Sequence, residues 1–157
     1  MSLIICLAIV LLDQVTKILV REHLAFGSVT RVIPGFMNLT HLRNTGAAWG
    51  MLGSQNLFLT LLSAVMLVLM IVFRRSFVNT SRIHRVAFGL LMGGIIGNLI
   101  DRIRQGAVTD FLDFYVANSH WPSFNVADAA ICTGVGLYLL SSFLDARAAR
   151  QATTHEE

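Results

Sequence analysis

Four long apolar segments dominate the pattern of hydrophobic and polar positions along the chain, and polar stretches separate them. The segments cover residues 3–20, 57–73, 86–100 and 126–143. Each approaches the length of about 20 mostly apolar residues that an α-helix needs to cross a membrane. No Pro/Gly/Ser-rich linker divides the 157 residues. The pattern therefore predicts one integral-membrane domain, 1–157, with four spanning helices.

Three of these segments carry polar side chains at one end only. The first is apolar as far as Leu12 and then carries Asp13 and Lys17, the third runs into Asp101, and the fourth has Asp128 in its first turn. If the chain alternates direction through the membrane, all three polar ends face the same compartment. Carboxylates in or beside lipid are costly, so their presence there indicates a functional site.

Composition and charge agree with a membrane protein. Hydrophobic residues make up 55% of the chain and charged residues 13%, whereas soluble domains average about 25% charged residues. Linker 74–85 and tail 144–157 hold six Lys and Arg in 26 residues, against five in the 60 residues of loops 21–56 and 101–124. Because cytoplasmic segments carry the excess of Lys and Arg, we predict that the polar helix ends face outward. The net charge of +3 follows from these arginines and requires no nucleic acid.

The connecting segments give weaker signals. Residues 29–42 contain a Pro-Gly turn signal and partial alternation of polar and apolar residues, which predicts short strands. The sequence GAAWGML at 46–52 predicts a short interfacial helix whose tryptophan lies in the aromatic belt of the membrane. From about residue 148 the chain is polar, and we predict a disordered tail.

Spacing groups several of the polar residues on shared helix faces. Asp13 and Lys17 stand at i and i+4, so they can neutralise each other, and structural bracing is as good an interpretation as a direct role. Asn98, Asp101 and Arg102 also share one face. The alternative for that face is an ordinary interfacial helix end with a snorkelling arginine.

Three glycines form two overlapping GxxxG repeats in the third apolar segment. They are Gly89, Gly93 and Gly97. Small residues at this spacing let a neighbouring backbone approach closely. We interpret the repeat mainly as a packing surface, and a role in admitting substrate is the lesser alternative.

Two aspartates, Asp110 and Asp128, lie on the predicted outer side beside helix ends. FNVAD (124–128) on its own favours an N-terminal cap, with Asn125 as the cap and Asp128 as the acidic member of a capping box. Two carboxylates a few ångströms apart do not both ionise easily, so one holds a proton while the other acts as a base, as in aspartic proteases. Asp113 lies three residues beyond Asp110, and spacing alone leaves open which of them is the partner.

Several motifs, taken in order, resemble the lipoprotein signal peptidase family, also called signal peptidase II. They are DQVTK (13–17), NTGAAWG (44–50), GNLIDR (97–102), VTDFLDFY (108–115) and FNVADAAI (124–131). The resemblance implies an all-α membrane protein: four transmembrane helices with both termini cytoplasmic, a small extracytoplasmic β-cradle and a short interfacial helix. Trp49, where the family usually has phenylalanine, affects at most the packing of that helix.

Matched by motif position, the resemblance implies that Asp110 and Asp128 form the catalytic pair, and it makes Asp113 a bystander. The residues that would line the site and orient the substrate carbonyl or the aspartates are Asn44, Asn98, Arg102 and Asn125. The residues that would brace the helix bundle around the site are Asp13, Lys17 and Asp101.

The reaction implied is hydrolysis of a prolipoprotein on the N-terminal side of its diacylglyceryl-modified cysteine. The enzyme would work as a monomer in the bacterial cytoplasmic (inner) membrane, in contact with membrane lipid. We expect no cofactor and no metal, because the five histidines show no ligand spacing.

Two other classes of function remain open from the residues alone. A small transporter or proton-relay subunit also carries intramembrane acids, but it needs polar residues continuing into the cytoplasmic half, where the first two apolar segments have almost none. A purely structural bundle would use the same charges only to lock its helices together.

Overall fold

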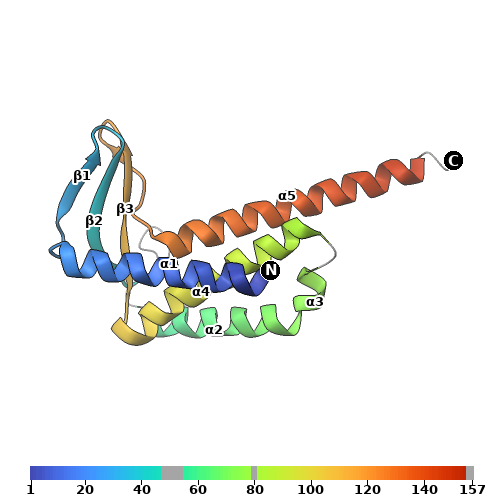
Figure 1. The fold of residues 1–157 in the computed structure, drawn as a ribbon, viewed down its shortest axis with the longest axis horizontal. Coiled ribbons are helices and arrows are strands. Elements are labelled where there is room, and N and C mark those ends of the chain that lie inside the picture. The colour runs from blue at the N-terminus through green and yellow to red at the C-terminus, as the bar shows by residue number, and fades with distance from the viewer. Residues whose placement is uncertain (47–54, 79–80, 155–157) are drawn as a thin grey trace.

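A helix bundle with a small antiparallel sheet at one end forms the structure (Figure 1). The computed structural model describes residues 1–46, 55–78 and 81–154. The elements are α1 (Ser2–His23), β1 (Val29–Ile33), β2 (Met37–Asn44), α2 (Asn56–Val72), α3 (Arg74–Phe77), α4 (Arg82–Gln105), β3 (Val108–Val116), β4 (Ser119–His120) and α5 (Val126–Thr154). The interfacial helix predicted over 46–52 lies outside the described residues, apart from Gly46.

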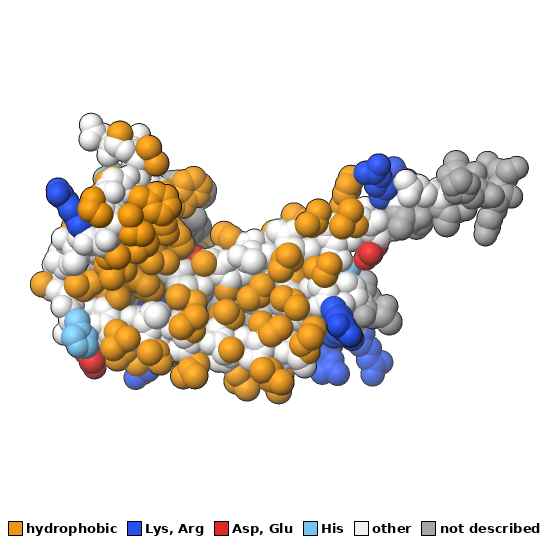
Figure 2. Space-filling view, turned by 45° about the horizontal axis from the view of Figure 1, so that its top comes forward, with side chains coloured by type: hydrophobic (Ala, Val, Ile, Leu, Met, Phe, Trp, Pro, Cys, Tyr) orange, Lys and Arg blue, Asp and Glu red, His pale blue; other side chains and the backbone are white. Residues whose placement is uncertain are grey.

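The long helices carry their apolar side chains on the outside. Leu3, Leu57 and Leu139 are 69%, 72% and 62% exposed, and Figure 2 shows apolar side chains along the helices with Lys and Arg gathered toward the ends. α1, α4 and residues 126–147 of α5 are long and apolar enough to cross a membrane. α2 is also apolar but has 17 residues. The chain is therefore a multi-pass membrane protein with three to four apolar helices, because such a surface is stable only in lipid.

The fourth predicted segment extends further than its apolar run. α5 continues to Thr154, through the part of the chain that we predicted as a disordered tail from about residue 148. The sequence ARAARQA in this stretch consists of strong helix formers, which allows the helix to continue after its hydrophobic residues end.

α4 lies at the centre of the bundle, where it packs against α1, α2 and α5. Its glycines provide the close contacts: a Cβ atom on Gly93 would come within 2.7 Å of the Cβ of Ile9 in α1. A Cβ on Gly94 would collide with the carbonyl oxygen of Ala127 in α5. The prediction that the glycine repeat is a packing surface is confirmed, and this close approach brings the polar residues of α1, α4 and α5 together.

The sheet has the strand order β1-β2-β3-β4, with antiparallel neighbours. β1 and β2 confirm the strands predicted within 29–42. β3 was not predicted, because the sequence placed Asp110 beside a helix end, whereas the residue lies inside this strand opposite Leu42 of β2. Its partner strand is far away in the chain, and no local pattern reports such a pairing.

The glycine packing gives a stability prediction. Gly93→Ala places a methyl group against the α1 backbone, and overpacking of this kind costs about 1–3 kcal/mol. We expect a lower midpoint of thermal unfolding in detergent. Gly136→Ala in α5 is the matched control, because the added methyl group would have no heavy atom within 4 Å. Equal unfolding temperatures for the two variants would contradict the close α1–α4 contact.

Candidate active site

The first turn of α5 fixes the position of Asp128. The side-chain oxygen of Asn125 accepts a hydrogen bond from the Asp128 N–H at 3.0 Å, and the Asp128 Oδ2 accepts one from the Asn125 N–H at 3.2 Å. This reciprocal pair is the capping box that the sequence predicted. It holds the Asp128 carboxylate at a helix N-terminus, where the helix dipole favours negative charge.

Strand β3 positions Asp110. Its carboxylate accepts hydrogen bonds from the side-chain amides of Asn44 at 2.9 Å and Asn125 at 2.7 Å. Because side chains alternate along a strand, Asp113 points to the opposite face, where Asn38 and His120 contact it. Asp113 is not among the described residues that line the cavity around Asp110.

Asn125 joins the two carboxylates. It is fully buried, its side-chain amide donates to Asp110, and its backbone N–H donates to Asp128. This single residue, which directly precedes α5, therefore fixes the position of one aspartate relative to the other.

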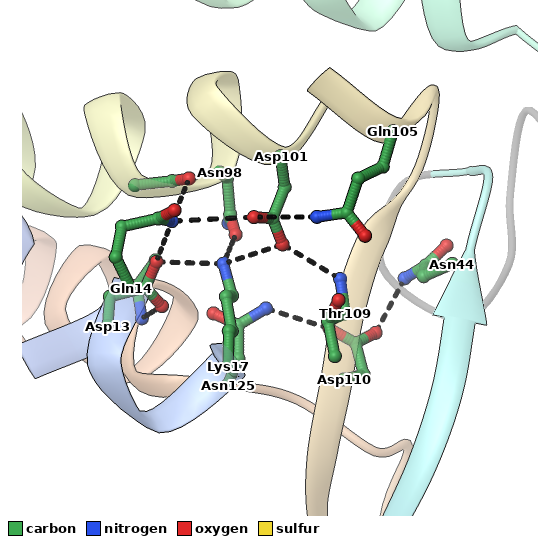
Figure 3. A network of polar contacts seen from close by, with 12 residues as sticks. Asp13, Gln14, Lys17, Asn44, Asn98, Asp101, Gln105, Thr109, Asp110 and Asn125 are labelled. Atoms are coloured by element: carbon green, nitrogen blue, oxygen red, sulfur yellow. Dashed lines mark hydrogen bonds and ion pairs between the residues drawn. The ribbon is translucent and has the colours of Figure 1, made fainter. Parts of the chain in front are cut away.

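A buried cation supports the other side of Asp128. Asn98 of α4 donates from its amide nitrogen to Asp128 Oδ1 at 2.7 Å and accepts from the Lys17 ammonium at 2.9 Å. Since an ammonium only donates, the amide oxygen must face Lys17, and this leaves the NH₂ group for Asp128. Lys17 is fully buried and lies 2.8 Å from Asp13 and 3.4 Å from Asp101 (Figure 3).

The acids beside Lys17 hold neighbouring backbone as well. Asp13 in α1 accepts the N–H of Ala127 at 2.9 Å, and Asp101 in α4 accepts the N–H of Thr109 at 3.0 Å. The first bond ties α1 to the start of α5, and the second ties α4 to β3. The structure thus brings all nine predicted site residues into one region around Asp110 and Asp128.

Gln14 and Arg21 are among the residues of this network that were not predicted. Gln14 donates from its amide to Asp13 and to the Gly97 carbonyl, both at 3.1 Å. Arg21 lies 3.7 Å from Asp101 and donates to the Thr109 hydroxyl at 3.0 Å. The spacing of Arg21 contained a signal, since it lies four residues after Lys17 and so continues the same helix face.

A cavity of about 460 Å³ opens above the two aspartates. Its polar lining residues are Asn44, Asn98, Arg102, Asp110, Ser123 and Asp128, and its other lining residues include Val108, Trp121, Pro122, Phe124, Ile131 and Cys132. Arg102 points a guanidinium nitrogen to within 3.5 Å of the Gly46 carbonyl. The cavity combines two acids and one cation with a mostly apolar wall, as ligand-binding sites do in which a few polar groups orient the bound molecule.

The environment of Asp110 changes its acidity. Burial raises its pKa to about 6, and the nearby Asp128 carboxylate adds to the rise. The hydrogen bonds from Asn44 and Asn125 and the charge of Lys17 act in the opposite direction. Asp110 therefore keeps its proton at a pH where an ordinary aspartate has lost it.

Sequence comparisons agree on one family. The model of the family described as signal peptidase (SPase) II matches residues 5–144. A lipoprotein signal peptidase of Symbiobacterium thermophilum is 42% identical over 140 residues, which are 89% of this chain and 92% of that protein. One of Syntrophotalea carbinolica is 42% identical over 146 residues, 91% of each chain.

Solved structures show the same fold. A bacterial membrane enzyme determined by the in meso method at 2.3 Å resolution superposes with a TM-score of 0.86 and 34% identity, over 92% of this chain and 88% of that one. Another, determined by the same method at 1.9 Å, gives a TM-score of 0.79 at 34% identity, over 89% and 90% of the two chains.

The buried cation gives a second stability prediction. Lys17→Met leaves Asp13 and Asp101 without their shared cation, and breaking a buried ion pair in this way costs about 3–5 kcal/mol. We expect a large fall in the midpoint of thermal unfolding in detergent, with partial recovery when Asp101→Asn is added. The control is Arg104→Met, which removes an exposed cation from the end of the same α4. If Lys17→Met were as stable as the parent, the ion pairs would not hold the bundle.

Proposed function

Because the chain belongs to the signal peptidase II family, it is a membrane protease of prolipoprotein signal peptides, and we propose that it works by an aspartic mechanism at Asp110 and Asp128. One observation carries the proposal: both carboxylates line the same cavity and are joined through Asn125. Aspartic catalysis requires this proximity, because one acid has to give a proton while the other takes one.

The surroundings of the two acids suggest their roles. We assign the proton to Asp110, since burial and the second carboxylate raise its pKa, and the role of the base to Asp128, which lies at the capped helix N-terminus where the helix dipole favours negative charge. Asp128 takes a proton from water, the resulting hydroxide bonds to the scissile carbonyl carbon, and Asp110 protonates the carbonyl oxygen. When the tetrahedral intermediate collapses, the carbon–nitrogen bond breaks and the amine leaves with the proton from Asp128. One hydroxyl of the intermediate returns its proton to Asp110 as the carbonyl reforms, which restores both aspartates to their starting states.

The remaining polar groups of the cavity orient the substrate. Arg102 has further donors beyond its contact with the Gly46 carbonyl, and these can bind the backbone carbonyls of an extended peptide. Asn44 and Asn98 hold Asp110 and Asp128 in place through hydrogen bonds of 2.9 and 2.7 Å. Their role is to keep the carboxylates in position while protons move.

Four spanning helices fit the dimensions of a membrane. α2 has 17 residues and so reaches about 26 Å, close to the roughly 30 Å of the hydrocarbon core. With four crossings, both termini and the arginine-rich segment that begins with α3 are cytoplasmic. The sheet and the cavity then lie at the extracytoplasmic surface, and the chain acts as a single-domain monomer.

The cavity wall accounts for the lipid on the substrate. Trp121, Pro122 and Ile131 form an apolar lining beside the two acids, and the outer surface of the helices is itself in contact with lipid. A diacylglyceryl-modified cysteine can therefore keep its acyl chains in the membrane while the peptide bond on its N-terminal side enters the site. A purified-enzyme assay on lipidated and unlipidated forms of one precursor tests this step, and equal cleavage of both would refute it.

The pair Asp110 and Asp128, called the dyad from here on, is tested by isosteric substitution. We expect Asp110→Asn and Asp128→Asn each to lower kcat for a lipidated prolipoprotein by at least about 10³-fold, because neither amide can exchange the proton. Asp145→Asn is the control, since it removes an exposed carboxylate from the far part of α5. Insertion and thermal unfolding are measured on all three variants. Near-normal turnover by either dyad variant would make the assignment wrong.

The raised pKa of Asp110 predicts the pH dependence. Protonated Asp110 is the active form, so kcat/KM is highest below about pH 6 and falls as pH rises through that value, where Asp110 loses its proton. Asn44→Ala removes a hydrogen bond that favours the ionised form. The decrease of kcat/KM with rising pH should therefore occur at higher pH in this variant. A shift to lower pH would contradict the assigned role of Asp110.

A further inference from the structure

Another buried carboxylate, Asp113, lies on the face of β3 opposite to Asp110. Asp113 is 7% exposed, and its two oxygens have different partners. Oδ2 accepts from the side-chain amide of Asn38 in β2 at 2.8 Å, and Oδ1 lies 2.7 Å from Nδ1 of His120 in β4. Because its partners lie on β2 and β4, this buried carboxylate links both strands to β3 through side-chain hydrogen bonds.

The β3–β4 hairpin, which carries His120, depends on these side-chain contacts. β4 has two residues, so its own ladder with β3 is short. The turn before it places Ala117 at φ 52°, a left-handed conformation that is unfavourable for a residue with a side chain. The contacts of His120 compensate for this, because its ring also stacks on Tyr115 with centroids 5.0 Å apart and planes 13° apart.

The residues after His120 form a wall of the cavity. Trp121, Pro122 and Ser123 line it, and Trp121 is 60% exposed. Phe124 is fastened separately, because it exchanges backbone hydrogen bonds of 2.8 and 3.1 Å with Leu112. The wall 121–123 is thus flanked by an anchor at His120 and a second one at Phe124, which directly precedes Asn125. Within the wall, the Trp121 N–H also donates to the Phe114 carbonyl of β3 at 2.7 Å.

We propose that Asp113 and His120 position the wall 121–123 and thereby set the affinity for substrate, while the separate anchor at Phe124 keeps the dyad in place. This inference rests on the proposed function, since the wall is taken to contact the prolipoprotein. Asp113 is a positioning residue that acts through His120 and does not take part in the chemistry. Loss of the His120 contact should weaken substrate binding without moving the carboxylates of Asp110 and Asp128.

The experiment compares three histidine variants on a lipidated prolipoprotein. His120→Leu removes the contact with Asp113, and His120→Asn keeps a donor near the position of Nδ1. His23→Leu is the control, because its ring contacts a carbonyl of its own helix. We expect KM to rise about tenfold for His120→Leu with kcat within about twofold. His120→Asn should bring KM back toward the parent value, and His23→Leu should leave it unchanged.

A second readout needs no activity. The chain has two tryptophans, so in a Trp49→Phe background the fluorescence comes from Trp121 alone. His120→Leu should increase the quenching of this fluorescence by acrylamide, and His120→Asn should reverse the increase. Unchanged quenching, an unchanged KM, or a fall in kcat with KM unchanged would overturn the inference. If the dyad variants stayed active while the quenching changed as expected, the proposed chemistry would fail and the anchor would stand.

Discussion

The ammonium group of Lys17 is fully buried among apolar helices, where an unpaired charge would cost several kcal/mol. Its partners are Asp13 on α1 and both Asp101 and Asn98 on α4. Lipid supplies no hydrophobic force between helices, so polar contacts and close glycine packing set how the helices associate. Because Asp13 and Asp101 also hold backbone N–H groups of α5 and β3, one buried charge fixes three helices and a strand relative to one another.

A chain of hydrogen bonds connects the Lys17 ammonium to Asp128 and Asp110, and the chemistry of its members fixes which group donates in each bond. Lys17 donates to Asn98, Asn98 donates to Asp128, and the capping box joins Asp128 to Asn125, which donates to Asp110. Each amide has its oxygen and nitrogen assigned by a neighbour that only donates or only accepts. The contacts that stabilise the bundle are therefore also those that orient the carboxylates, and a change that loosens the bundle disturbs the site.

Local patterns predicted the parts of this structure that depend on neighbouring residues. The apolar runs indicated the helices, FNVAD indicated the cap, and the repeat at 89–97 indicated close packing, because each is a property of one helix. β3 was missed, since its partner β2 lies about 70 residues earlier and VTDFLDFYV contains two acids that do not look like a strand. The bonds of Gln14 and Arg21 were missed for the same reason, because their acceptors include atoms on α4 and β3.

The strand also explains why spacing could not choose between Asp110 and Asp113. On a helix, residues three apart share one face, and both acids would have faced the cavity. On a strand they face opposite sides, so β3 directs Asp110 toward Asn44 and Asn125 and directs Asp113 toward Asn38. One nine-residue strand thus separates two chemically identical side chains into different environments. Under the mechanism we propose, the first exchanges protons with the substrate, and the second keeps the surrounding wall in place.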